Sequence, residues 1–320
     1  MPAPGSRLPV ILDTDPGIDD ACAILLALAS PELDVRGLAI TYGNTILEHA
    51  HRNAVELLRR VGRRLPIAVS ARRPQRRPLA VALETHGEQG LGYAPLPPAG
   101  SVLDFAYPLE RLLAAQPTPV TLVTLGPVTG LARALRREPA MVRAKVSRHI
   151  AMIGNVKAQG NTTPYAEFNA WCDPEALDIV LRADLNTEMV GLDVTRQIVI
   201  TAAEIDKLKG GGPDARFLYD ALRFYVEFHR QYEQLDGAVI NDILPIAALL
   251  DPSVLTFTPL RLAVGLVDGD ERGRTKVDPE GAKARAATAT DAEGVRSFLF
   301  DRVLEPARRG DPLCAREVAA

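Results

Sequence analysis

The chain has 320 residues, of which 47% are hydrophobic and 24% are charged, and its formal net charge at pH 7 is −3. This composition supports a sizeable core and excludes a general electrostatic attraction to nucleic acid or anionic membrane. Three cysteines without metal-type spacing argue against a disulfide framework. The first residues lack a signal-peptide layout, and no uncharged apolar run reaches the roughly 18 residues of a membrane span. We therefore expect a soluble, cytoplasmic protein.

Short apolar runs alternate with amphipathic stretches along most of the chain. The apolar runs predict strands at residues 8–12, 35–41, 66–70, 119–125, 148–153 and 187–193. The amphipathic stretches predict helices at 20–29, 46–61, 104–115, 127–137, 174–183, 214–232, 240–250 and 294–308. Because strands that alternate with helices indicate parallel βαβ units, we predict an α/β fold. The expected architecture is a single large domain over residues 1–320, with a doubly wound, mostly parallel central sheet flanked by helices.

Three stretches need separate interpretation. Gly210–Pro213 separates two predicted helices and could be mistaken for a domain boundary. We interpret it as a surface loop, because the chain after it carries an acidic residue that the site near the start of the chain, described below, needs. The arginine-rich stretch 59–77 is interpreted at its start as the solvated end of a helix, without a functional assignment. The compositionally simple stretch 282–290 receives no assigned element.

Four aspartates fall within eight residues near the start of the chain, at Asp13, Asp15, Asp19 and Asp20. They follow the first predicted strand and precede the first predicted helix. In an open α/β sheet this turn faces the crevice at the carboxyl ends of the strands, where ligands bind. Four carboxylates repel one another unless a cation joins them, and hard divalent cations prefer oxygen ligands. The cluster therefore indicates a metal site.

Taken alone, this motif allows other interpretations. Asp13 is a candidate nucleophile toward a phosphate in a metal-dependent phosphatase, with Asp15 as its acid/base. Asp19 is also placed to cap the following helix. Capping explains one acid but not four, and a phosphatase needs a downstream lysine and a further acidic motif that we do not find.

Further motifs resemble those of the nucleoside hydrolase family, the inosine–uridine preferring N-ribohydrolases. The Asp13–Asp20 segment is similar to the family's signature. Other similarities follow in chain order at Thr41–Asn44, Thr85–Gly92, Leu125–Thr129, Gly160–Asn161, Ala166–Asn169, Asp173–Ala176, Asp242 and Arg272–Thr275. The resemblance covers about residues 8 to 278, and the ordered set is far more specific than any one motif.

The resemblance implies a Ca²⁺ cofactor and a reaction. The implied metal ligands are Asp15, Asp20, Asp242 and the main-chain carbonyl of Leu125, a donor set that suits calcium. Leu125 stands where the family usually has Thr, a change that a main-chain ligand tolerates. The implied reaction is Ca²⁺-dependent hydrolysis of the N-glycosidic bond of ribonucleosides, which releases free base and ribose. Asp15 is implied as the catalytic base that activates a metal-bound water.

The resemblance also implies ribose contacts and partners. The substrate-binding residues are Asp19 and Asn169 at the 2′-hydroxyl, Asp242 and Asn44 near the 3′-hydroxyl, Asn161 and Glu167 at the 5′-hydroxyl, and Ile153 in an apolar wall where many relatives have Met. Asp13 is expected to orient its neighbours. The expected partner is a small ribonucleoside rather than nucleic acid or membrane, and the family likeness implies a homo-oligomer, a dimer or tetramer.

Asn241 departs from the family pattern. Many relatives carry His immediately before the last metal-binding Asp, where it is proposed to protonate the departing base. Asparagine donates hydrogen bonds but transfers no proton at neutral pH. We therefore take Asn241 and His86 as the catalytic candidates beside the base, with His86 the remaining acid. Tyr225, His229 and Tyr232 fit base-side contacts and packing equally well. The base preference stays open, as does a catalytically weak nucleoside-binding protein.

Overall fold

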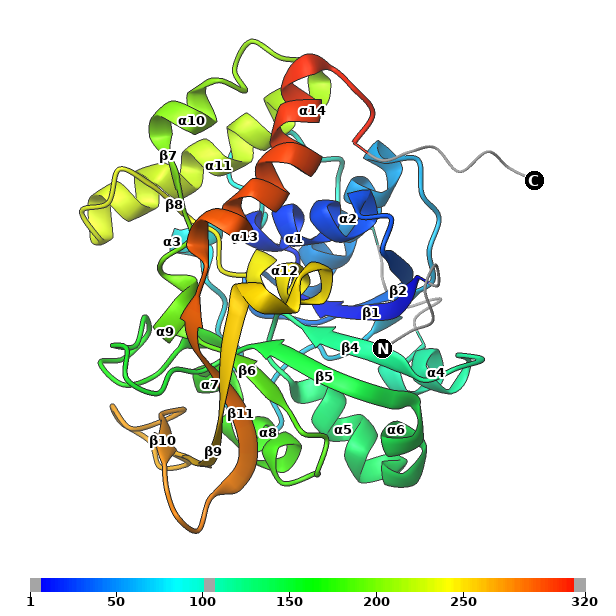
Figure 1. The fold of residues 1–320 in the computed structure, drawn as a ribbon, viewed down its shortest axis with the longest axis vertical. Coiled ribbons are helices and arrows are strands. Elements are labelled where there is room, and N and C mark those ends of the chain that lie inside the picture. Colours follow the sequence, from blue (N-terminus) through cyan, green and yellow to red (C-terminus); the bar gives the residue numbers. More distant parts are fainter. Residues whose placement is uncertain (1–6, 101–106, 314–320) are drawn as a thin grey trace.

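A nine-stranded sheet forms the centre of the protein, for which the computed structural model describes residues 7–100 and 107–313 (Figure 1). The strand order is β10-β9-β11-β6-β5-β4-β1-β2-β3. The six predicted strands are all present, as β1 (Leu8–Thr14), β2 (Leu33–Ile40), β3 (Ile67–Val69), β4 (Val120–Thr124), β5 (Val146–Met152) and β6 (Glu188–Val190). These six pair in parallel.

The remaining strands were not predicted. The sheet continues through β11 (Ala282–Thr290), which is parallel to β6, and through β9 (Leu255–Val264) and β10 (Thr275–Val277), which pair antiparallel. The stretch without an assigned element is thus strand β11, whose five alanines carry no strand signal in isolation. A separate antiparallel pair is formed by β7 (Val199–Thr201) and β8 (Gly237–Val239).

Helices cover both faces of the sheet (Figure 1). One face carries α1 (Ile18–Ala29), α2 (Leu47–Arg60), α11 (Pro213–Tyr232), α12 (Ile243–Leu250) and α13 (Ala292–Leu299). The other carries α4 (Leu109–Ala114), α5 (Thr129–Arg137), α6 (Pro139–Lys145) and α8 (Pro174–Leu181). Each group packs its apolar side chains into its own core layer. The predicted fold class, a mostly parallel α/β sheet flanked by helices, is confirmed.

Shorter elements change several predicted boundaries. They are α3 (Leu83–His86), α7 (Phe168–Cys172), α9 (Leu192–Thr195), α10 (Ala202–Asp206), a 3₁₀ turn η1 (Pro252–Val254), a π-helical segment η2 (Phe300–Leu304) and α14 (Glu305–Arg309). The predicted strand 187–193 stops at Val190, where α9 follows. The predicted helix 240–250 begins at Ile243, which leaves Asn241 and Asp242 at its N-terminal end. Residues 104–106 of another predicted helix lie outside the described residues, and within the described ranges no helix is long and apolar enough to cross a membrane.

The position of β1 in the sheet determines where a ligand can bind. β1 lies between β2 and β4, so the order 3-2-1-4-5-6 reverses direction beside it. Open α/β sheets bind ligands at such a switch point, outside the carboxyl ends of the strands. Here the amide of Leu125, just after β4, donates to the carbonyl of Asp13 at 2.7 Å. The acidic turn after β1 and the loop after β4 are therefore adjacent.

Candidate active site

The turn between β1 and α1 is closed by one of its own aspartates. The Asp20 carboxylate accepts the amide hydrogens of Gly17 at 3.0 Å and of Asp15 at 3.3 Å, and it also accepts the Thr14 hydroxyl. The Asp20 side chain, in the first turn of α1, thereby accepts hydrogen bonds from amides that have no partner within the helix. Asp20, rather than the expected Asp19, is thus the acid that caps helix α1.

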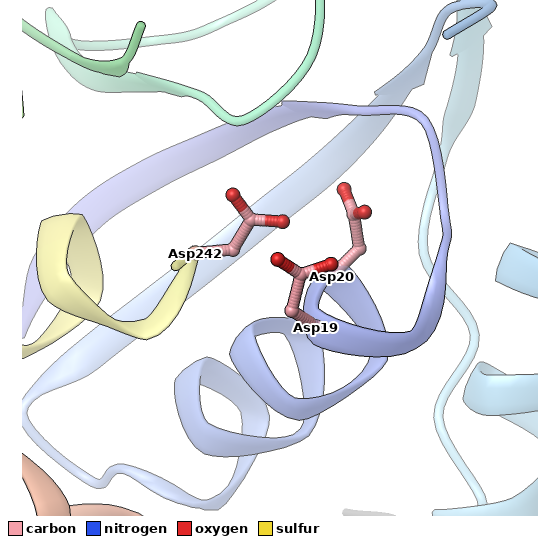
Figure 2. A group of neighbouring side chains, drawn as sticks. All are labelled: Asp19, Asp20 and Asp242. Atoms are coloured by element: carbon pink, nitrogen blue, oxygen red, sulfur yellow. The ribbon is translucent and has the colours of Figure 1, made fainter. Parts of the chain in front are cut away.

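Three carboxylates meet at this helix start. Asp19 and Asp20 from α1 and Asp242 from the N-terminal end of α12 each offer an oxygen, and these oxygens all lie within 4.8 Å of one another (Figure 2). All three side chains are buried. Burial, followed by repulsion from neighbouring carboxylates, raises the pKa of Asp20 and raises that of Asp242 well above its ordinary value.

Asp15 lies in a tight main-chain enclosure beside this group. Its Oδ2 accepts the Asn44 amide at 2.7 Å, whereas its buried Oδ1 has no hydrogen-bond partner among the described residues. A Cβ atom placed on Gly43 or Gly126 would lie 2.0 Å or 2.4 Å from its carboxylate oxygens. These glycines therefore allow the loops after β2 and β4 to close directly on Asp15. Burial, and next the charge of Asp20, raises the pKa of Asp15 well above its usual value.

The donor set fits a divalent cation. Asp15 Oδ1 and Asp19 Oδ1 are buried acceptors without partners in the described part of the chain, and a hard cation binds such oxygens. Asp20 and Asp242 belong both to the predicted ligand set and to the compact group, which includes Asp19 but not Asp15. The carbonyl of Leu125 accepts the Asn169 amide at 2.7 Å and keeps a second lone pair.

A cavity opens above these acids. The predicted residues that line it are Asp19, Asn44, His86, Leu125, Asn161, Glu167, Asn169, Asn241 and Asp242. Asp15 and Asp20 are fully buried and lie behind this lining. The fold thus brings together residues from loops that are more than 200 positions apart in the chain.

Ile153 differs from its predicted place. Its side chain is fully buried in the core layer formed by α5 and α8, on the far face of the sheet. Met152, one residue earlier, lines the cavity instead. Neighbouring side chains at the end of a strand point to opposite faces of the sheet. A prediction that is wrong by one residue therefore places the side chain on the wrong face.

His86 lines the cavity but is held as a neutral imidazole. Its Nδ1 accepts the amide hydrogen of Ile18 at 3.1 Å, which requires that nitrogen to be unprotonated. Burial lowers the pKa of His86 to about 4. At neutral pH the ring therefore completes the cap of α1 and carries no acidic proton of useful strength, so the geometry argues against His86 as the acid.

Asn241 acts on Asp19 in this structure. Its Nδ2 donates to Asp19 Oδ2 at 3.2 Å, and the Tyr225 hydroxyl donates to the same oxygen at 3.4 Å. Both contacts favour the ionised form of Asp19, against the burial that raises its pKa. Asn241 thus fixes the orientation of a carboxylate beside the cavity.

Glu167 and Asn161 form another wall of the cavity while also supporting the backbone. Glu167 caps α7, accepting the amide hydrogens of Asn169 at 2.7 Å, Gly154 at 2.8 Å and Ala170 at 3.0 Å. Asn161 Oδ1 accepts the Phe168 amide at 2.9 Å, which leaves its Nδ2 as a donor. Burial raises the pKa of Glu167 to about 7.

This shift predicts a pH-dependent stability difference between the wild type and Glu167→Gln. The folded protein keeps a proton on Glu167 that the unfolded chain releases above its ordinary value of 4.5, so ionisation opposes folding increasingly between pH 4.5 and 7. Glutamine does not ionise. The free energy of unfolding of the wild type should therefore fall relative to the variant by on the order of 3 kcal/mol across that window. Urea unfolding at a series of pH values measures it, and a pH-independent difference would contradict the shift.

Helix α11 supplies cavity residues that sequence reasoning left open. Tyr225 and His229, one turn apart, both line the cavity, and the helical spacing was the signal that could identify them. Tyr232 is 55% exposed and lies outside the lining. Thr85 and Phe168, which lie within two of the family-like segments, also contribute. So do residues without any prior signal, namely Ala82, Met152, Thr162, Leu192, Arg196, Phe228, Glu233 and Val239.

Comparison with known proteins agrees with this geometry. The family described as "inosine-uridine preferring nucleoside hydrolase" matches residues 10–297. The pyrimidine-specific ribonucleoside hydrolase RihA of Citrobacter koseri is 37% identical over 307 residues, covering 92% of this chain and 98% of that protein.

Solved structures show the same similarity. The plant nucleoside hydrolase PpNRh1 superposes with a TM-score of 0.86 at 33% identity, covering 94% of this chain and 100% of that one. The purine-preferring ribonucleoside hydrolase of Gardnerella vaginalis gives a TM-score of 0.85 at 27% identity, covering 94% and 99%. The resemblance predicted from the motifs is confirmed, and the chain belongs to the inosine–uridine preferring nucleoside hydrolase family, whose members act on N-glycosidic bonds.

Proposed function

We propose that this protein is a Ca²⁺-dependent ribonucleoside hydrolase that releases free base and ribose. The observation that carries the proposal is the buried carboxylate group of Asp19, Asp20 and Asp242 at the floor of a cavity walled by asparagines. Carboxylates suit a hard cation, and amides suit the hydroxyls of a sugar. RihA of C. koseri is named pyrimidine-specific and the G. vaginalis enzyme purine-preferring, so the relatives leave the base preference open.

Asp15 is the proposed general base. Its unpartnered Oδ1 is the atom free to take a proton from the attacking water. Ca²⁺ bound by Asp15, Asp20, Asp242 and the Leu125 carbonyl would supply the positive charge that lowers the pKa values of Asp15 and the water. Attack at C1′ passes through an oxocarbenium-like state, and Asp19, held by Asn241, stabilises the positive charge on the sugar.

Hydrogen bonds already made in the site define which atoms remain for the ribose. Asn169 Nδ2 donates to the carbonyls of Leu125 at 2.7 Å and Met152 at 3.1 Å, so its Oδ1 is left to accept from a hydroxyl. Asn44 Nδ2 donates to Asp20 at 2.6 Å, which likewise leaves Oδ1. The two asparagines therefore offer acceptors to sugar hydroxyls, while Asn161 Nδ2 offers a donor.

Base release from a panel of ribonucleosides tests the proposal. The purified protein should release free base from at least one of inosine, uridine, cytidine and adenosine, detected by chromatography. Phosphate release from nucleotides without base release would overturn it in favour of a phosphatase. Saturable nucleoside binding without turnover, in the presence of added Ca²⁺, would instead identify a binding protein.

A further inference from the structure

The hydrolysis proposed above needs a proton for the departing base, and three side chains that line the cavity are poorly suited to give one. Asn241 has no acidic proton, and its amide is used on Asp19. His86 is neutral, with Nδ1 accepting the Ile18 amide. Tyr225 donates its hydroxyl to Asp19, and burial raises its pKa well above the ordinary value. None of these three side chains is therefore an effective general acid.

His229 has a different hydrogen-bond arrangement. Its Nδ1 lies 2.7 Å from the carbonyl oxygen of Tyr225, one turn earlier in α11. Because a carbonyl only accepts, Nδ1 carries a proton, and Nε2 is the nitrogen that gains or loses one. Nε2 has no hydrogen-bond partner among the described residues, and the side chain lines the cavity.

Packing fixes the orientation of this ring. The Tyr225 ring centroid lies 4.4 Å from that of His229, and the Phe228 ring packs against it edge-on at 5.3 Å. The ring is only 3% exposed. With Nδ1 bound to a carbonyl of its own helix, Nε2 is the ring nitrogen that remains for a group in the cavity.

Charged and titratable groups surround His229 from several elements. Burial lowers its pKa, whereas the Tyr225 carbonyl, the Glu233 carboxylate and the Asp19 carboxylate raise it. His86 of α3 and Asp242 of α12 share the same cavity. The nearby carboxylates thus compensate part of the cost of a buried imidazolium.

We propose that His229 is the general acid of this enzyme and donates the Nε2 proton to the departing base, a role that rests on the proposed hydrolysis. The C1′–N bond breaks, its electron pair moves to the base, and the base takes the proton from Nε2. The water oxygen bonds to C1′ and its proton passes to Asp15. His229 regains a proton and Asp15 loses one to solvent before the next turnover.

A leaving-group comparison tests this role. In His229→Gln, kcat for the best ribonucleoside of the panel should fall about 10²- to 10⁴-fold, the usual contribution of a general acid. With 4-nitrophenyl β-D-ribofuranoside the loss should stay within about threefold, because 4-nitrophenolate departs without protonation. Thermal unfolding of the variant checks that it folds, and Tyr232→Phe, an exposed change in the same helix, is the matched control.

The outcomes separate this role from the proposed function. Equal losses on both substrates would overturn the acid role and indicate that His229 only shapes the site. Unchanged rates on both would overturn it as well. A wild type that hydrolyses neither substrate would contradict the proposed hydrolysis itself.

Discussion

Asp15→Asn is expected to lower kcat for ribonucleoside hydrolysis by roughly 10³- to 10⁴-fold, at the upper end of the contribution of one general base. The variant keeps the shape of the side chain but removes both the basic oxygen and one carboxylate for the cation. We expect it to fold, because Asp15 Oδ1 is buried without a partner in the described residues and a neutral amide relieves the repulsion with Asp20. Steady-state kinetics and thermal unfolding measure the two effects.

A neighbouring aspartate provides the comparison. Asp13 is equally buried at the end of β1, but its Oδ2 accepts the Ser70 hydroxyl at 2.9 Å, and burial alone raises its pKa, whereas the charges of Asp20 and Asp19 also raise the pKa of Asp15. Asp13→Asn should therefore lose much less activity than Asp15→Asn. Near-wild-type turnover by Asp15→Asn would rule out its role as the base.

Removal of Ca²⁺ is the second large effect that we expect. Dialysis against a calcium chelator should abolish base release, and added Ca²⁺ should restore it. Binding of the ion only to the folded protein also stabilises it, by about 2.7 kcal/mol at a concentration of 100 times Kd. For a chain of 320 residues that corresponds to an increase in Tm of roughly 4 °C.

The pH dependence of this stabilisation has a definite sign. Burial raises the pKa values of Asp15, Asp20 and Asp242 above 3.8, so the folded protein without the ion holds protons that the unfolded chain releases. Its stability therefore falls as pH rises through that range. Protons compete with the cation for the same oxygens, so the increase in Tm on adding Ca²⁺ should be larger at pH 8 than at pH 5.

Two variants serve as controls for the metal. Asp242→Asn removes a proposed ligand and should lose most of the Ca²⁺-dependent increase in Tm, whereas Asp34→Asn, remote from the acidic turn and paired with Arg36, should retain it. Full activity in the chelated protein, with no change in Tm on adding Ca²⁺, would contradict a calcium requirement.

The parallel half of the sheet could be predicted because its signals are local. Each of the six predicted strands is a short apolar run followed by a helical pattern, and β1 and β4 are buried along nearly their whole length. Strands β9 and β11 lack that signal. Their residues are half-exposed in part, and β11 is defined by pairing with β6 and β9 rather than by its own composition. Strand propensity of this kind depends on neighbours that a single sequence does not reveal.

In the acidic cluster, too, some features could be predicted from local sequence and others depend on tertiary contacts. The motif Asp13–Asp20 indicated a cation site because like charges at a strand end need a counterion. The role of each aspartate, however, depends on distant parts of the chain. Asp20 caps α1 and lies beside Asp242, while Asp15 is enclosed by Gly43 and Gly126. Those partners come from β2, β4 and α12, and their distance from Asp15 and Asp20 depends on the strand order.

By itself, the sequence of this protein determined the α/β class, the acidic turn after β1 and the family, since each rests on residue types in a fixed order along the chain. Only the tertiary structure decided which side chains face the cavity. Met152 rather than Ile153 lines it because alternate residues at the end of β5 face opposite layers. His86 is neutral because its Nδ1 meets the start of α1, and His229 reaches the cavity because α11 packs beside that same turn. The orientation of a side chain toward the cavity and the protonation of a buried histidine depend on contacts between distant segments, which no local sequence pattern encodes.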